Sequence, residues 1–79
     1  MKITITLRGS LKKYFGEDKE RKIEVPDDCT AAEALRAVDI DWEQIPTFGF
    51  VAVNGKRVMI SDKLAPGDEL KAYSKIGGG

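Results

Sequence analysis

The first eight residues, Met1-Lys2-Ile3-Thr4-Ile5-Thr6-Leu7-Arg8, alternate strictly between apolar and polar side chains. This period of two is typical of a β-strand with one face in a hydrophobic core and the other toward solvent. The alternation returns at residues 21–25, where Ile23 and Val25 point to the same side. Between these strands, residues 11–15 carry apolar side chains at helical spacing. We therefore expect a β-hairpin whose long connection contains a short helical turn.

One amphipathic helix follows this hairpin. Thr30 and Glu33 match the capping box, in which a threonine at the N-cap is followed three residues later by a glutamate. The apolar side chains after Thr30 recur at the spacing of one helix face. The pattern predicts a helix that begins after Thr30, ends near Asp39 and buries one side.

Three more strands are expected in the second half of the chain, at residues 48–53, 56–60 and 69–76. Asn54-Gly55 is a strong signal for a tight hairpin turn, because both residues accept a positive φ. A loop with Leu64 as its apolar plug connects the last two strands.

The expected order is strand, strand, helix and three strands, which predicts an α+β fold. It consists of a mixed sheet of four to five strands with one main helix packed on one face. If the first and last strands pair in parallel at the centre, the arrangement is the β-grasp, or ubiquitin-like, fold.

Composition excludes several classes of function. The 79 residues suffice for one small domain, and 13 basic side chains balance 13 acidic ones, so no cationic excess favours binding to nucleic acid. No apolar run approaches the roughly 20 residues that span a bilayer, so we expect a cytoplasmic protein without a membrane partner. The chain has one cysteine and no histidine, which disfavours a disulfide, a metal site and an unaided hydrolase.

The last four residues, Ile76-Gly77-Gly78-Gly79, are the strongest functional candidate. We expect residues 1–76 to form the domain and residues 77–79 to form a flexible tail, since glycine has no Cβ and fits narrow channels. A C-terminal carboxyl with a pKa of about 3.3–3.7 is ionised at neutral pH. One interpretation is that the carboxylate of Gly79 is a reactive group. The other is that the glycines are a frayed end or a cloning remnant.

An ordered set of segments adds a further signal: Leu7-Arg8-Gly9-Ser10-Leu11-Lys12, Ile23-Glu24-Val25-Pro26, Val53-Asn54-Gly55-Lys56-Arg57-Val58, Leu64-Ala65-Pro66-Gly67-Asp68-Glu69 and the final glycines. Through this set the sequence resembles the MoaD/ThiS family of small ubiquitin-like sulfur carrier proteins over nearly its whole length. The ending Tyr73-Ser74-Lys75-Ile76 lacks the two prolines that MoaD proteins usually carry before their glycines, and with its glycines it is more similar to ThiS. The length and the N-terminal half are more similar to MoaD.

The resemblance implies a carrier that is a co-substrate of its partners and is not itself an enzyme. A separate adenylating enzyme, similar to ubiquitin-activating enzymes, uses ATP to activate the carboxylate of Gly79, and a sulfur atom then converts it to a thiocarboxylate. Gly77 and Gly78 let the backbone enter the active site. The chain binds no cofactor itself.

The sulfur acceptor implied by the family is a second synthase subunit. A MoaE-like subunit making molybdopterin, for the molybdenum or tungsten cofactor, is favoured, with this chain as the small subunit of molybdopterin synthase. A thiazole synthase-like partner in thiamine synthesis is the alternative. A ubiquitin-like modifier conjugated through Gly79, or a non-covalent adapter whose glycines have no role, also remains open.

A second contact area is expected because ordering glycines in a channel costs roughly 1–2 kcal/mol or more per residue. By alternation, the sheet face without the helix carries an aromatic pair and nearby cations, which favour a docking surface. The pair also fits an ordinary cross-strand contact. The candidate partner-binding residues are Phe50, Lys71, Tyr73, Ile76 and Arg8.

Two other residues, Cys29 and Trp42, are functional candidates by their position in the sequence. A thiol such as that of Cys29, beside a helix N-terminus, can become reactive, but a small buried residue before the cap fits better. Trp42 can anchor a partner, but we expect it to cover an open edge of the core.

Overall fold

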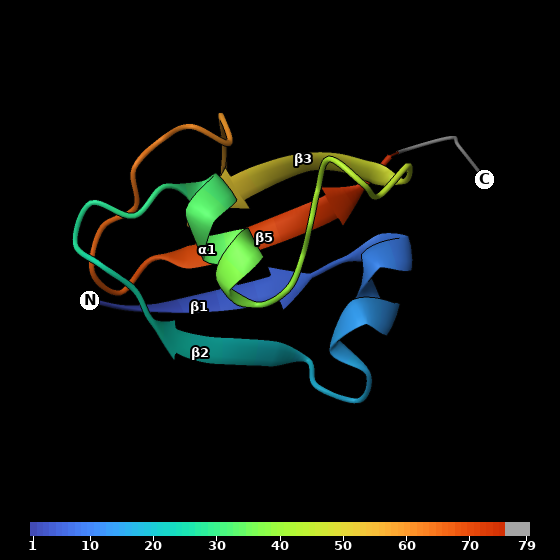
Figure 1. The fold of residues 1–79 in the computed structure, drawn as a ribbon, viewed down its shortest axis with the longest axis horizontal. Coiled ribbons are helices and arrows are strands. Elements are labelled where there is room, and N and C mark those ends of the chain that lie inside the picture. Colours follow the sequence, from blue (N-terminus) through green and yellow to red (C-terminus); the bar gives the residue numbers. More distant parts are fainter. Residues whose placement is uncertain (76–79) are drawn as a thin grey trace.

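Five strands form one mixed sheet, and a helix packs across one of its faces (Figure 1). The computed structural model describes residues 1–75. The strand order across the sheet is β2-β1-β5-β3-β4. The elements in chain order are β1 (Lys2–Leu7), the 3₁₀ helix η1 (Gly9–Phe15), β2 (Glu20–Glu24), α1 (Ala31–Ala37), β3 (Phe48–Val53), β4 (Lys56–Val58) and β5 (Glu69–Ser74).

The first and last strands lie side by side at the middle of the sheet. β1 and β5 run parallel, with Ile5 beside Leu70 and Leu7 beside Ala72. The other neighbours are antiparallel: β2 with β1, and β3 with both β5 and β4. The predicted parallel pairing is confirmed, and the sheet has five strands. The fold is therefore the β-grasp, or ubiquitin-like, arrangement.

The hydrophobic core lies between the sheet and α1. The alternation of β1 is confirmed, because Ile3, Ile5 and Leu7 are all buried. The predicted helical turn is also present as η1, whose Leu11 and Phe15 are buried. The remaining core side chains come from every part of the fold, among them Val25, Ala31, Ala34, Leu35, Val38, Ile40, Val51, Leu64, Leu70 and Ala72.

The capping box at the start of α1 is confirmed. The backbone N–H of Glu33 donates to the Thr30 hydroxyl at 3.2 Å, and the N–H of Thr30 donates to the Glu33 carboxylate at 3.0 Å. The helix ends at Ala37, earlier than predicted. Asp39 adopts a positive φ of 63°, which interrupts the helix and allows the N–H of Ile40 to donate to Leu35 at 2.9 Å.

The hairpin at Asn54-Gly55 is confirmed, since both residues have a positive φ, of 52° and 84°. β4 is shorter than predicted and ends at Val58. The chain turns there because the N–H of Met59 donates to the Asp62 carboxylate at 2.9 Å. Within residues 1–75, no helix is long and apolar enough to cross a membrane.

Candidate functional site

The sheet face that α1 leaves uncovered carries most of the predicted docking residues. The strand register aligns one row of side chains across it, in the order Glu20, Thr6, Lys71, Ala52 and Arg57. Ala52 is nearly buried although it lies outside the core cluster, because longer side chains flank it on this face. This open sheet face is therefore continuous from β2 to β4.

The predicted aromatic pair lies in the next row. Phe50 and Tyr73 are direct cross-strand partners, and their rings stack with centroids 4.7 Å apart and an interplanar angle of 11°. The guanidinium carbon of Arg57 lies 4.7 Å from the centre of the Phe50 ring, a cation–π distance. The cross-strand interpretation of the pair is confirmed, and the pair lies outside the core cluster. Its role in docking a partner stays a prediction.

Sequence reasoning missed Arg57 as part of this surface. The available signal was the alternation of side chains along residues 56–58. Val58 packs against the core, so the adjacent Arg57 must face the other side of the sheet. The structure brings four predicted residues to the open sheet face. They are Phe50, Tyr73, Lys71 and Arg8, and the last two line one pocket.

The end of β5 is enclosed by two glycines from distant parts of the chain. A Cβ placed on Gly9 would lie 2.1 Å from the Ser74 hydroxyl oxygen, and one on Gly49 would lie 2.9 Å from the Ser74 backbone. The N–H of Ser10 donates to the same hydroxyl at 3.3 Å. A side chain at Gly49 would meet the backbone of β5, whereas one at Gly9, where φ is positive, would displace the Ser74 hydroxyl.

The backbone that follows is also held. β3 carries an irregularity in register at Gly49, and the N–H of Lys75 donates to the Thr47 carbonyl at 2.7 Å. These contacts fix the direction of the chain up to Lys75. The predicted site residues Ile76, Gly77, Gly78 and Gly79 lie outside the described residues.

Cys29 is buried, and this burial raises the pKa of its thiol, with a further increase from the negative charge of Glu33. The thiol donates to the Thr30 carbonyl at 3.3 Å. A thiol with a raised pKa is a weaker nucleophile at neutral pH. The structure therefore favours the small buried role. In the part of the chain that is described, no three acidic or cysteine side chains are grouped to hold a metal ion.

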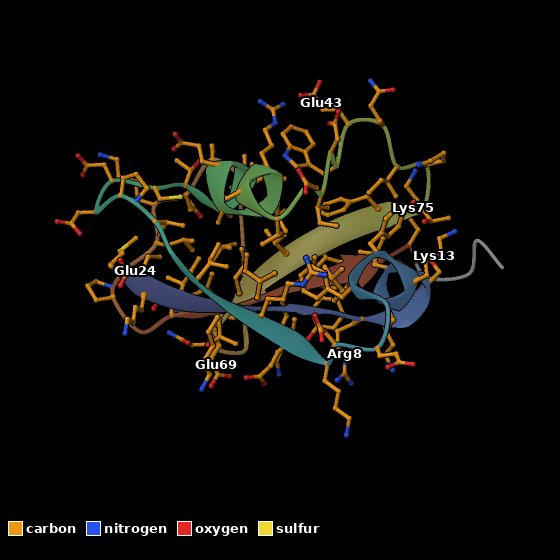
Figure 2. The ribbon with its side chains drawn as sticks, turned by 60° about the horizontal axis from the view of Figure 1, so that its bottom comes forward. Arg8, Lys13, Glu24, Glu43, Glu69 and Lys75 are labelled. Carbon is orange, nitrogen blue, oxygen red and sulfur yellow. The ribbon has the colours of Figure 1, made fainter. Side chains whose placement is uncertain are left out.

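Trp42 packs against the core as a partly buried side chain. The guanidinium of Arg36 lies 5.5 Å from its ring centre and donates to Glu43 at 2.6 Å. Figure 2 shows Glu43 on the α1 side of the molecule, away from Arg8. Trp42 therefore packs at an edge of the core, as expected, where it lines a shallow pocket that Phe50 and Arg57 also reach.

Solved structures of ubiquitin-like proteins match this architecture over the whole molecule. SAMP1 from Haloferax volcanii matches with a TM-score of 0.77 and 23% identity, covering 100% of both chains. A protein described as molybdopterin converting factor subunit 1, from Pyrococcus furiosus, matches with a TM-score of 0.75 and 17% identity, covering 96% of this chain and 99% of the other. This chain has their fold.

A third match comes from a complex of two proteins. It is a chain from the complex of subunits 1 and 2 of the molybdopterin-converting factor from Helicobacter pylori, with a TM-score of 0.63, 18% identity and 100% of both chains covered. No protein-family model and no curated protein matches the sequence. At these identities the likeness is one of fold, and it agrees with the resemblance to MoaD-like carriers.

Proposed function

We propose that this protein is a sulfur carrier whose C-terminal Gly79 is adenylated by a partner enzyme and converted to a thiocarboxylate. Its sulfur would then be donated in cofactor biosynthesis, with molybdopterin as the favoured product. The observation that carries the proposal is the place of the glycine run in the sequence. It follows the central strand of a sheet whose fold is that of SAMP1 and molybdopterin converting factor subunit 1.

The chemistry requires activation because a carboxylate is a poor electrophile. A Gly79 carboxylate oxygen would attack the α-phosphorus of ATP, forming an acyl-adenylate and releasing pyrophosphate. A sulfide ion would then attack the acyl carbon, and AMP would leave. With a persulfide donor, a thiol reductant must afterwards break the sulfur–sulfur bond.

The chain itself would present the reacting group. It has no histidine, the commonest general base, so we assign the proton transfers to the partners. Gly77 and Gly78 would admit the backbone to a narrow channel, and Ile76 would contact its entrance. The open sheet face, with Phe50 and Tyr73, would offset the entropy lost by ordering the glycines.

The proposed partners are an adenylating enzyme and a sulfur-accepting synthase subunit. The second is supported by the fold shared with a chain of the Helicobacter pylori complex of two converting-factor subunits. Sulfur transfer to a thiazole precursor instead of a pterin would place the protein in thiamine synthesis. Assaying both acceptors with the thiocarboxylated chain separates these pathways.

The test is incubation of the chain ending at Gly79 with ATP and candidate adenylating enzymes. We expect pyrophosphate release, followed with a sulfur donor by a mass gain equal to the exchange of one oxygen for sulfur. Matched controls are a chain without Gly79 and one with an alanine added after it, and both should be inactive. Equal pyrophosphate release from the extended chain would refute the proposal, and so would no release with any candidate enzyme.

Conjugation to other proteins is the second candidate function. It is favoured by the structural likeness to SAMP1, which is described as a small archaeal modifier protein. Isopeptide-linked bands that depend on Gly79 in extracts of the native host would support it. Full activity after deletion of Gly78 and Gly79 would instead indicate a non-covalent adapter.

A further inference from the structure

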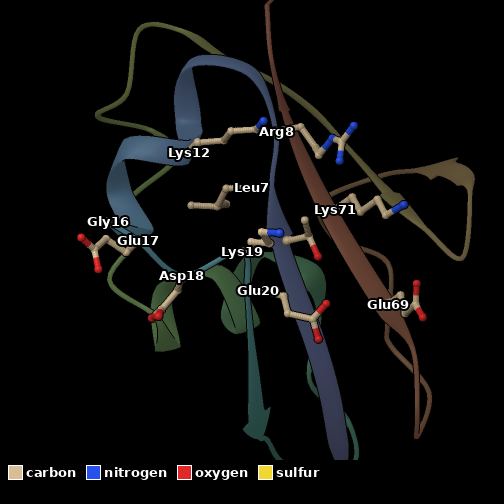
Figure 3. Close-up of a pocket in the computed structure, with 11 residues that line it drawn as sticks. Leu7, Arg8, Lys12, Gly16, Glu17, Asp18, Lys19, Glu20, Glu69 and Lys71 are labelled. Carbon is tan, nitrogen blue, oxygen red and sulfur yellow. The ribbon is translucent and has the colours of Figure 1, made fainter.

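A pocket of about 510 Å³ opens between β1, β5 and the connection from η1 to β2. Figure 3 shows Arg8, Lys12 and Lys71 on the side of this pocket toward the C-terminal end of β5. Glu20 and Glu69 lie toward the other end. Lys19 lies beside Glu20, and Glu17 and Asp18 also line the pocket, so the charges there are mixed. The end with Arg8, Lys12 and Lys71 is basic, and it lies toward the C-terminal end of β5.

The three cations are not neutralised within residues 1–75, because no ion pair there involves Arg8, Lys12 or Lys71. The nearby acid Asp18 is already paired with Arg21 at 3.2 Å. Grouped like charges repel each other, and an opposite charge brought between them is attracted. Since the chain has no net charge, this grouping is a property of the fold and not of the composition.

We infer that this basic end binds an acidic segment of the partner protein that receives the tail, an inference that rests on the proposed function. One or more Asp or Glu carboxylates of the partner would lie among Arg8, Lys12 and Lys71. A guanidinium can bind a carboxylate through two hydrogen bonds, and the two ammonium groups add attraction.

The carboxylates of Glu17, Glu20 and Glu69, which also line the pocket, favour a peptide over a free polyanion as the occupant. A nucleotide or polyphosphate would meet the carboxylates of Glu20 and Glu69, whereas a peptide segment can place a neutral or basic residue there. Complementary charges of this kind raise association rates and fix orientation. Bound here, the segment would hold the partner against the side of the sheet from which the chain continues to its glycines.

The first test measures pyrophosphate release by the adenylating partner at low and high salt. Arg8→Gln, Lys12→Gln and Lys71→Gln are each expected to raise the KM for this protein about two- to fivefold at low salt, and much less at high salt. The matched control is Lys22→Gln. Lys22 faces Thr4 on the neighbouring strand, does not line the pocket and loses the same charge. An equal effect of Lys22→Gln, or no effect of the three variants, would overturn the inference.

The second test needs no enzyme and separates this inference from the proposed function. The full chain, labelled with ¹⁵N, is titrated with a glutamate-rich peptide and with a lysine-rich peptide. We expect amide shifts around Arg8, Lys12 and Lys71 with the acidic peptide only. Three outcomes would contradict the inference. They are shifts spread over all lysines, equal shifts with inorganic phosphate, and binding that requires prior removal of Gly77, Gly78 and Gly79.

Discussion

Ser74 lies between two glycines that are far apart in the sequence, and both have to lack a side chain for β5 to end where it does. Gly9 and Gly16 make a useful comparison. Both have a positive φ, of 62° and 61°, but only Gly9 has a neighbour within reach of an added Cβ. The cost of the backbone conformation can therefore be separated from the cost of the contact.

We predict that Gly9→Ala destabilises the protein more than Gly16→Ala. Gly16→Ala should lower the free energy of unfolding by roughly 1–3 kcal/mol, because φ of 61° and ψ of −121° form a backbone conformation that L-residues rarely adopt. Gly9→Ala adds a clash with the Ser74 hydroxyl oxygen, for a total of roughly 2–4 kcal/mol. Urea unfolding measures both variants.

Ser74→Ala is the control for this comparison, because it removes the clashing oxygen. In that background, Gly9→Ala should cost little more than Gly16→Ala. Equal costs of the two glycine variants in the original background would show that the close approach to Ser74 contributes nothing.

The position of an individual side chain could be predicted from the sequence only where the regular alternation of a strand, or the period of a helix, decides which way it faces. The sequence predicted that Phe50, Tyr73 and Lys71 share a face, because strands alternate. It did not predict the contact of Ser10 with Ser74, which are 64 residues apart in the chain. Such contacts depend on the register of β1 against β5, and composition and period do not determine it.

α1 has only seven residues, so it depends on its cap and on its buried face. The Thr30 backbone and hydroxyl both donate to the Glu33 carboxylate, and these hydrogen bonds lower the pKa of Glu33 from its ordinary value of 4.5. The bonded, charged form is therefore favoured in the folded state. Protonation of Glu33 weakens the start of the helix.

We predict that the extra stability from Glu33 is present above pH 4.5 and is lost as the pH falls through its lowered folded-state pKa. Glu33→Gln keeps an acceptor for the cap but does not titrate. The difference in unfolding free energy between the wild type and Glu33→Gln should shrink on acidification below about pH 4.5.

Urea unfolding at several pH values measures this difference. Thr30→Ala is the control, because it removes the hydroxyl donor and should reduce the pH dependence contributed by Glu33. A constant difference between wild type and Glu33→Gln down to about pH 3 would contradict the assignment, because that pH is roughly 1.5 units below the ordinary value of 4.5.

The ends of elements were harder to predict than their existence. The capping box placed the start of α1 correctly, because it is a local hydrogen-bonding pattern. Its end depends on Asp39 adopting a positive φ, which asparagine and aspartate do only in some contexts. β4 ends early because the Asp62 carboxylate binds the N–H of Met59, an interaction that apolar periodicity does not report.

At the scale of the whole molecule, β5 joins the two halves of the sheet, with β1 on one side and β3 on the other. Leu70 of β5 is among the largest fully buried side chains. A domain of this size has a small core, and its total stability is typically only about 5–15 kcal/mol. Truncation of the Leu70 side chain alone therefore affects the stability of the whole fold.

We predict that Leu70→Ala lowers the free energy of unfolding by about 2–5 kcal/mol, the usual cost of truncating a buried leucine. Met59→Ala is the matched control, because Met59 is of similar size but 68% exposed, and it should change stability by less than about 0.5 kcal/mol. Thermal unfolding followed by circular dichroism measures both. Similar losses in the two variants would mean that β5 is not central to the core.

The parallel pairing of β1 with β5 has a consequence during synthesis on the ribosome. The hairpins on either side of β5 emerge first but have no strand to connect them, and contacts between distant segments form late in folding. The sheet of the nascent chain therefore stays incomplete until residues 69–74 leave the exit tunnel. Release upstream of them would leave open strand edges exposed to degradation, so translation products that lack β5 would not survive as native protein.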